Sequence, residues 1–130
     1  MKVERKKKIK ETLCGCDDCS NSDKYFDNLQ RTGKDLKFNQ KLISLSTFLN
    51  ALGNKERLTI LTALKDKDRC VCELEAILDK SQPSISHHLR ELEKVDLIRG
   101  WKKGKYTYYT LLKKEFEKYL ANLNQEFHFE

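Results

Sequence analysis

The sequence predicts a mainly α-helical fold with one β-hairpin near its C-terminal end, and three observations predict it. Apolar residues recur every three to four positions between residues 42 and 92, as on the buried face of a helix. After Asp96 the period changes, and two segments rich in β-forming residues flank a basic turn that contains a glycine. From Leu112 to Leu123 the helical period returns.

Length, charge and cysteine content limit the class of protein. With 130 residues the chain has room for one compact domain and flexible ends, and its formal net charge of +6 favours nucleic acid over an anionic membrane as partner. No apolar stretch approaches the roughly 18 residues of a membrane span, and the basic N-terminus lacks the apolar region of a signal peptide. We therefore expect a cytoplasmic protein whose five cysteines are reduced, which favours metal or redox chemistry over structural disulfides.

Residues 1–24 are predicted to form a flexible basic arm, and residues 25–130 a folded domain. The arm carries the basic run 5–8 and three cysteines, but almost nothing that a core would bury. It also lacks the apolar anchors that would hold it on a membrane.

The first two helices of the domain are predicted from repeated leucines. Gly53 is expected to end the first helix in a left-handed conformation, and Asn54 to cap the second. The buried face of the first is expected to contain Leu45, Phe48, Leu49 and Leu52. That of the second is expected to contain Leu58, Leu61 and Leu64.

Two further helices follow, separated by the short polar break 79–81. Asp68 is expected to cap the third helix, and Pro83 to occupy the first position of the fourth, where its missing N–H costs nothing. His88 faces the inner side of the fourth helix, so we expect a packed, hydrogen-bonded core histidine. The buried residues are expected to be Val71, Leu74, Ile77 and Leu78 in the third helix and Ile85, Leu89 and Leu92 in the fourth.

Two helices joined by such a break and followed by a hairpin form a winged helix-turn-helix. The hairpin strands are expected at 97–101 and 106–111, with the basic turn 102–105 between them. A final helix places five apolar residues on one face, namely Leu112, Phe116, Tyr119, Leu120 and Leu123.

The outer face of the fourth helix carries groups able to contact DNA. With the apolar stripe inward, His87 and Arg90 point outward and Ser84 and Ser86 lie on the flanks. Gln82, at the helix entrance, is suited to contact an adenine. The hairpin is expected to reach the DNA backbone or minor groove with Lys102, Lys103 and Lys105. The alternative is a solvated face that contacts nothing, but the basic hairpin beside it favours double-stranded DNA as partner.

The segment Ser81-Gln82-Pro83-Ser84-Ile85-Ser86-His87-His88-Leu89-Arg90-Glu91-Leu92 resembles the recognition-helix signature of ArsR/SmtB repressors. The resemblance covers residues 40–120, and it implies a transcriptional repressor that pairs into a homodimer largely through terminal helices and leaves its operator when a metal or other inducer binds. No enzyme is expected, because the sequence contains no phosphate loop, no nucleophile with a suitably spaced base and no paired catalytic carboxylates.

Cys70 and Cys72 fall in the predicted first turn of the third helix. A helix N-terminus lowers the pKa of a thiol and favours thiolate ligands, which select soft metal ions. On a regular helix, side chains two positions apart point roughly 200° away from each other. Either the first turn unwinds so that both sulfurs bind one ion, or one sulfur is the main ligand and other ligands come from elsewhere.

The segment from Arg69 to Leu74 resembles the Cys-Val-Cys metal box of the CadC/ArsR type. This implies a thiophilic inducer (Cd, Pb, Zn or As(III)), held by the box of one subunit and the arm of the other. The candidate ligands are Cys14, Cys16, Cys19, Cys70 and Cys72, and which arm cysteines bind is open. A thiol redox-sensing repressor of the same fold and a constitutive DNA-binding protein with structural zinc are the alternatives. The C-terminal helix lacks the histidine spacing of the family's other metal site, so no zinc is expected at Glu115, Glu117, His128 and Glu130.

Overall fold

The computed structural model describes residues 1–14 and 21–129, which form two compact units, Met1–Ile43 and Ser44–Glu130. The predicted division near residue 24 stays a prediction. Within the described residues, no helix is both long and apolar enough to cross a membrane.

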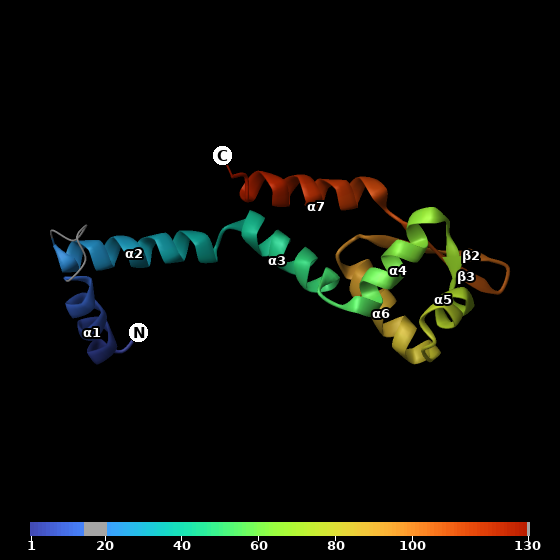
Figure 1. Ribbon diagram of the computed structural model, residues 1–130, viewed down its shortest axis with the longest axis horizontal. Coiled ribbons are helices and arrows are strands. Elements are labelled where there is room, and N and C mark those ends of the chain that lie inside the picture. Colours follow the sequence, from blue (N-terminus) through green and yellow to red (C-terminus); the bar gives the residue numbers. More distant parts are fainter. Residues whose placement is uncertain (15–20, 130) are drawn as a thin grey trace. The chain divides into compact units, whose positions relative to one another are not determined.

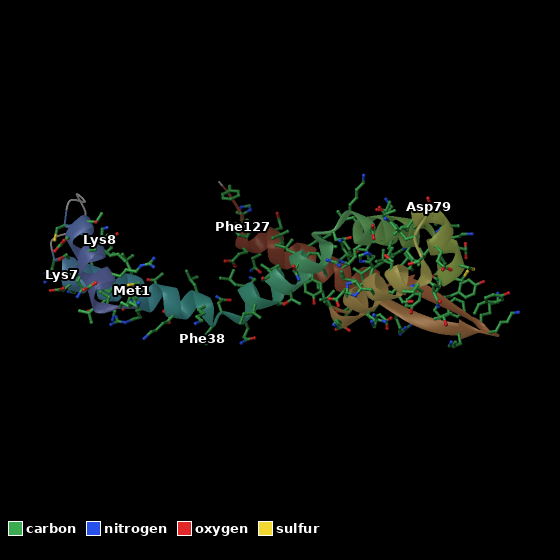
Figure 2. All side chains as sticks on the ribbon, turned by 90° about the horizontal axis from the view of Figure 1, so that it is seen from below. Met1, Lys7, Lys8, Phe38, Asp79 and Phe127 are labelled. Carbon is green, nitrogen blue, oxygen red and sulfur yellow. The ribbon has the colours of Figure 1, made fainter. Side chains whose placement is uncertain are left out.

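The first unit contains two helices that the sequence analysis did not predict, α1 (Val3–Leu13) and α2 (Ser22–Lys37) (Figure 1). The side chain of Asn21 caps α2 by accepting a hydrogen bond from the Lys24 amide at 3.2 Å. Lys10 joins the two helices, because its Nζ lies 2.9 Å from the Asp23 carboxylate and 5.3 Å from the centre of the Phe26 ring. Figure 2 shows Lys7 and Lys8 on α1, where both are exposed.

The second unit is a winged helix-turn-helix, which confirms the predicted fold class (Figure 1). Its helix-turn-helix is α5 (Val71–Leu78) followed by α6 (Gln82–Lys94), and the hairpin formed by β2 (Ile98–Lys103) and β3 (Tyr106–Leu111) is the wing. The elements, in chain order, are α3 (Gln40–Leu52), α4 (Lys55–Asp66), β1 (Arg69–Cys70), α5 (Val71–Leu78), α6 (Gln82–Lys94), β2 (Ile98–Lys103), β3 (Tyr106–Leu111) and α7 (Lys113–Glu126).

A third strand, which the sequence analysis missed, joins the wing. The three antiparallel strands lie in the order β1-β3-β2, with Cys70 of β1 opposite Tyr108 of β3. A two-residue strand is too short to show the alternating pattern by which strands are predicted. Asp68 does not cap α5 as expected. Its carboxylate accepts hydrogen bonds from Trp101 Nε1 at 3.1 Å and Thr110 Oγ1 at 2.7 Å, so it ties the start of β1 to the wing.

The core lies where the inner faces of α3 to α6 meet the base of the wing. Its fully buried side chains include Phe48, Ile60, Leu74, Ile85, Leu89, Leu92 and Leu97. Three of the core residues predicted in α3, α4 and α5 were wrong, because Leu49 is 42%, Leu58 47% and Ile77 45% exposed. Apolar residues three and four positions apart are compatible with more than one neighbouring face of a helix. In α4, packing buries the face that contains Ile60.

The predicted left-handed end of α3 at Gly53 was also wrong. Gly53 continues the helical hydrogen bonding, since its amide donates to the Leu49 carbonyl at 2.8 Å, and its φ is not positive. Asn54 caps α4 as predicted, accepting a hydrogen bond from the Arg57 amide at 3.1 Å. Glycine at this position still prevents a close contact, because a Cβ atom would lie 3.2 Å from the Leu49 carbonyl oxygen.

Helix α7 packs against α3 through aromatic rings. The Phe48 ring stacks on Tyr119, with centroids 4.5 Å apart, and meets Phe116 edge to face at 5.6 Å. Of the predicted apolar face, Leu120 is 45% exposed and Leu112 lies just before the helix. No residue of α7, all of whose positions are described, is fully buried.

The recognition helix α6 is seated as the sequence predicts. Its predicted apolar stripe is buried, and the turn before it contains Asp79 in the left-handed conformation (φ 53°), labelled in Figure 2. Pro83 is the second residue of α6 and not the first, but it still lies in the first turn, where no helical hydrogen bond is lost.

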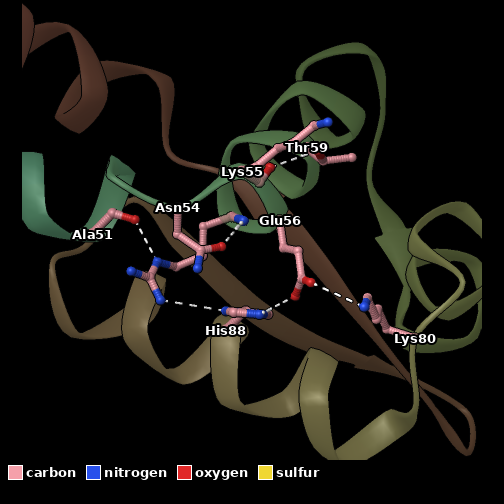
Figure 3. Close-up of polar contacts among 8 residues, drawn as sticks. Ala51, Asn54, Lys55, Glu56, Thr59, Lys80 and His88 are labelled. Carbon is pink, nitrogen blue, oxygen red and sulfur yellow. Dashed lines mark hydrogen bonds and ion pairs between the residues drawn. The ribbon is translucent and has the colours of Figure 1, made fainter.

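His88 is buried, 7% exposed, and joins α6 to α4 through hydrogen bonds, which confirms the predicted core histidine (Figure 3). Its Nε2 lies 2.5 Å from Glu56 Oε2, and its Nδ1 lies 3.5 Å from Arg57 Nη1. Arg57 also donates from Nε to the Ala51 carbonyl at 2.6 Å, so it caps the C-terminal end of α3. On its other side Glu56 lies 3.5 Å from Lys80, in the turn before α6. The Glu56–His88 contact therefore connects α3, α4, the turn and α6.

The hydrogen bond from His88, with the nearby Lys80 charge, holds the pKa of Glu56 below its ordinary value. A carboxylate with a lower pKa in the folded state binds fewer protons than in the unfolded chain, so it stabilises the fold above its unfolded pKa of about 4.3. This contribution is lost as the pH falls through the folded value. We expect Glu56→Gln to flatten the fall in unfolding free energy below about pH 4.3, measured by urea denaturation across that range.

The matched control is Glu117→Gln, which removes an exposed carboxylate from α7. It should retain the acid dependence of the wild type. If the free energies of unfolding of Glu56→Gln and of the wild type fall equally as the pH is lowered, this pH dependence does not come from Glu56.

Candidate nucleic-acid interface and thiol pair

The outer face of α6 presents the predicted polar residues to solvent. Gln82, His87 and Arg90 are exposed, and Ser84 and Ser86 lie half-buried on the flanks, as the helical period predicts. These side chains are directed away from the core because the opposite stripe of α6 is fully buried.

The N-terminal end of α6 has free capacity for hydrogen bonding. Ser81 occupies the cap position, but its side chain forms no capping hydrogen bond within the described part of the chain. The first-turn amides of a helix have no partner inside the helix and carry a partial positive charge. This end of α6 is therefore suited to an anionic group beside Gln82.

The wing presents three lysines at its outer end. Lys102 and Lys103 belong to β2, and Lys105 lies in a two-residue turn with Gly104, so the turn is shorter than the predicted segment 102–105. Gly104 has a φ of 62°, which glycine adopts without strain. All three lysines are exposed, and Lys105 Nζ lies 5.5 Å from the centre of the Tyr106 ring.

Aromatic stacking supports the wing on the side of Cys70. Trp101 in β2 stacks on Tyr108 in β3, with ring centroids 4.9 Å apart, and Trp101 also donates to the Asp68 carboxylate. Tyr108 is in turn the cross-strand neighbour of Cys70. The sequence carries no local signal for this support, because Asp68 lies far along the chain from Trp101 and Tyr108 and reaches them only when β1 pairs with β3.

Cys70 and Cys72 lie together, with their Sγ atoms 2.7 Å apart. The expectation that their side chains point roughly 200° apart was wrong, because it assumed that both lie in a helix. Cys70 ends β1 and caps α5 with an extended backbone (φ −81°, ψ 165°), whereas Cys72 is the second helical residue. The change of backbone conformation between them turns both sulfurs to the same side, so no helical turn has to unwind.

The two thiols differ in exposure and in chemical environment. Cys70 is 6% exposed, whereas Cys72 is exposed. Burial, and then the contact with Cys72, raise the pKa of the Cys70 thiol. The expected lowering by the helix N-terminus is therefore outweighed at Cys70. The Cys70 backbone amide donates to Glu73 Oε1 at 3.1 Å, so a carboxylate already occupies this helix end.

The thiol pair fits a soft metal ion by its chemistry, but it supplies only two ligands. No group of three or more His, Cys, Asp or Glu residues suited to a metal occurs within residues 1–14 and 21–129. Cys14 is exposed at the end of α1, in the first unit. Cys16 and Cys19 lie outside the described residues. The pair would need further ligands to complete the three or four thiolates that such ions prefer.

A pocket of about 370 Å³ lies beside the thiol pair. It is lined by both cysteines, by Gln82 at the start of α6 and by Lys102 and Lys105 of the wing. Three of the candidate DNA-contacting residues and both candidate ligands of α5 therefore surround one space. The sequence alone contained no signal for this arrangement.

Comparison with known proteins identifies the family. Residues 54–99, from the cap of α4 into β2, match the family described as "Bacterial regulatory protein, arsR family". The chain is 35% identical over 80 residues to the arsenical resistance operon repressor of Staphylococcus aureus, covering 62% of this chain and 77% of that protein. It is 40% identical over 67 residues to the cadmium resistance transcriptional regulatory protein CadC of Listeria innocua, covering 51% of this chain but only 56% of that protein.

The fold agrees with these matches. Reduced HlyU from Vibrio cholerae superimposes with a TM-score of 0.59 and 28% sequence identity, covering 72% of this chain and 99% of that one. Because the family match contains the whole helix-turn-helix and the Staphylococcus aureus relative is covered over 77% of its length, the chain belongs to the ArsR family of bacterial regulatory proteins.

Proposed function

We propose that this protein is a transcriptional repressor that binds double-stranded DNA with α6 in the major groove and the wing on the backbone. The observation that carries the proposal is that α6 buries one complete face in the core and directs its polar face, beside three wing lysines, to solvent. The name of the Staphylococcus aureus relative, an operon repressor, supports the same function. The relatives are transcriptional regulators, so we propose no enzymatic activity. Binding to an operator requires a location in the cytoplasm, as the sequence analysis expects.

We further propose that the protein acts as a homodimer paired through α3 and α7. Leu120 and Leu49 leave apolar area exposed on α7 and α3, and such area is suited to a subunit interface. Two recognition helices about 34 Å apart would then enter successive major grooves.

We propose a thiophilic ion (Cd, Pb, Zn or As(III)) as the inducer that releases the DNA. Cys70 and Cys72 would hold it together with two of the arm cysteines Cys14, Cys16 and Cys19. Support comes from the adjacent sulfurs and from the relatives whose names record cadmium and arsenical resistance. An ion at Cys70 acts on the cap of α5 and on β1, which is paired with the wing, so ligand binding and both DNA-contacting elements share backbone connections.

Oxidation of the same thiols is the second candidate trigger, and one observation favours it. The two Sγ atoms lie 2.7 Å apart, so a disulfide, with its bond of about 2.05 Å, requires only a small further approach. Release of DNA by diamide in the absence of metal would separate this trigger from the ion.

The two groups of DNA-contacting residues should respond differently to substitution. We expect His87→Ala or Arg90→Ala to relax sequence preference, at about 1–3 kcal/mol for a lost base contact. Lys102→Ala or Lys105→Ala should instead weaken binding to all sequences, and lower the salt slope by about 0.9 for each lost phosphate contact. Titrations of operator and unrelated DNA at several salt concentrations measure both effects.

Lys113→Ala and Lys114→Ala, which remove exposed charges from α7, serve as the charge-matched control. They should leave the salt slope close to that of the wild type. Wing variants with an unchanged slope would show that the wing does not contact the DNA backbone.

Metal response should depend on the thiol pair. We expect Cd(II) to produce thiolate charge-transfer absorption and to release the operator, because soft ions bind thiolates strongly. Cys72→Ser should retain DNA binding and lose the release, since the reading face of α6 is untouched. Cys14→Ser should lose less, because two other arm sulfurs remain. DNA binding followed by fluorescence anisotropy, with and without Cd(II), measures the response. A Cys70→Ser, Cys72→Ser double variant that still releases DNA as the wild type does would remove the pair from the mechanism.

A further inference from the structure

The pocket beside the thiol pair has features that a soft metal ion does not require. It extends from Cys72 across to the wing, and Lys102, Lys105 and Tyr106 form its far side. A space of about 370 Å³ is far larger than one ion and is comparable with the smallest pockets that hold organic ligands. It is therefore suited to an organic molecule that reaches Cys72 from the direction of the wing.

The charges around the pocket favour an anionic molecule. Two lysines and one carboxylate, that of Glu75, line it, which leaves an excess of positive charge. Gln82 adds an amide donor, and the first-turn amides of α6 follow it. These groups can bind a carboxylate while the exposed Cys72 sulfur remains accessible.

We propose that this pocket is a reaction site for low-molecular-weight disulfides that carry carboxylates, with Cys72 as the attacking thiol and Cys70 as the resolving thiol. The assignment of roles follows from exposure, because Cys72 is exposed and Cys70 is 6% exposed behind it. Both cysteines line the pocket, but a small disulfide meets the exposed Cys72 sulfur first, because little of Cys70 is accessible.

The chemistry proceeds in two exchanges. The Cys72 thiolate attacks one sulfur of the small disulfide RSSR, forming the Cys72–SR bond, breaking the S–S bond of RSSR and expelling one RS⁻. Cys70, after giving its proton to solvent, attacks the Cys72 sulfur at its 2.7 Å separation, forms the Cys70–Cys72 disulfide and expels the second RS⁻. The two thiols are oxidised by two electrons, and RSSR is reduced to two RS⁻.

This site has a consequence for DNA that rests on the proposed function. In the mixed disulfide, the carboxylates of R lie beside Gln82, Lys102 and Lys105. These are side chains that contact DNA if α6 enters the major groove and the wing lies on the backbone. The adduct should therefore weaken DNA binding by repelling phosphates and by occupying these side chains.

The test uses the full chain with Cys14, Cys16 and Cys19 replaced by serine, so that only the thiol pair reacts. Glutathione disulfide is the anionic probe and cystamine the cationic one. Mass spectrometry of the tryptic peptide 70–80, without reduction, follows the gain of one glutathionyl group and then the loss of two hydrogens. We expect glutathione disulfide to react faster than cystamine, and high salt to reduce the difference.

Variants test each assigned role. Lys102→Gln with Lys105→Gln should slow the reaction of glutathione disulfide about fivefold, from lost Coulomb attraction at about 8 Å in water, and should not slow that of cystamine. Lys113→Gln with Lys114→Gln, the matched control, should not. Cys70→Ser should trap the adduct on Cys72, and Cys72→Ser should prevent adduct formation on the buried Cys70. Circular dichroism confirms that each variant is folded. The same mass-spectrometric peptide measurement on the wild-type chain, with all five cysteines present, repeats the test without any substitution.

The proposal is overturned if cystamine reacts as fast as glutathione disulfide, if the wing lysines have no effect, or if Cys70 reacts in Cys72→Ser as fast as Cys72 does in the wild type. The proposed function is tested separately by operator binding of the purified adduct. Adduct formation at the expected rates with unchanged operator affinity would leave the reaction site in place and contradict the placement of DNA on the wing.

Discussion

The pairing of β1 with β3 is the interaction on which the arrangement of the site depends. It is only two residues long, yet it sets Cys70 in an extended backbone opposite Tyr108 and so places the start of α5 beside the wing. Asp68 strengthens this junction, because one carboxylate oxygen accepts hydrogen bonds from both Trp101 and Thr110 across the sheet. On a regular helix the two sulfurs would instead point apart.

Two kinds of interaction hold α6, the candidate DNA-contacting helix, against the core. The apolar stripe of α6 provides non-directional burial, which keeps this side of the helix on the core. The Glu56–His88 contact supplies direction, since a hydrogen bond depends on both distance and angle. Arg57 extends it to the end of α3, and α3 carries the aromatic contacts with α7. A change at the proposed dimer helices and a change at α6 therefore act on one connected set of contacts.

The location of the thiol pair gives it two connections to the proposed DNA contacts. One passes along α5 and through the left-handed Asp79 to α6, and the other passes through β1 and β3 to the wing. The shared pocket adds a direct connection, because what occupies it lies against Gln82 and the wing lysines. Thiol chemistry at this position therefore takes place in a pocket that three of the candidate DNA-contacting side chains also line.

Local patterns were enough to predict the fold class, the break before α6, the buried stripe of that helix and the outward position of His87 and Arg90. These depend on local periodicity and turn chemistry, which neighbouring residues encode. Long-range packing and strand pairing, in contrast, leave Leu49 and Leu58 exposed, make Asp68 hold the wing instead of capping α5, and place Cys70 and Cys72 at the same pocket. Each of these depends on segments far apart in the chain, and a two-residue strand leaves no periodic signal. The pairing of β1 with the distant β3 therefore could not be predicted from the local pattern of residues.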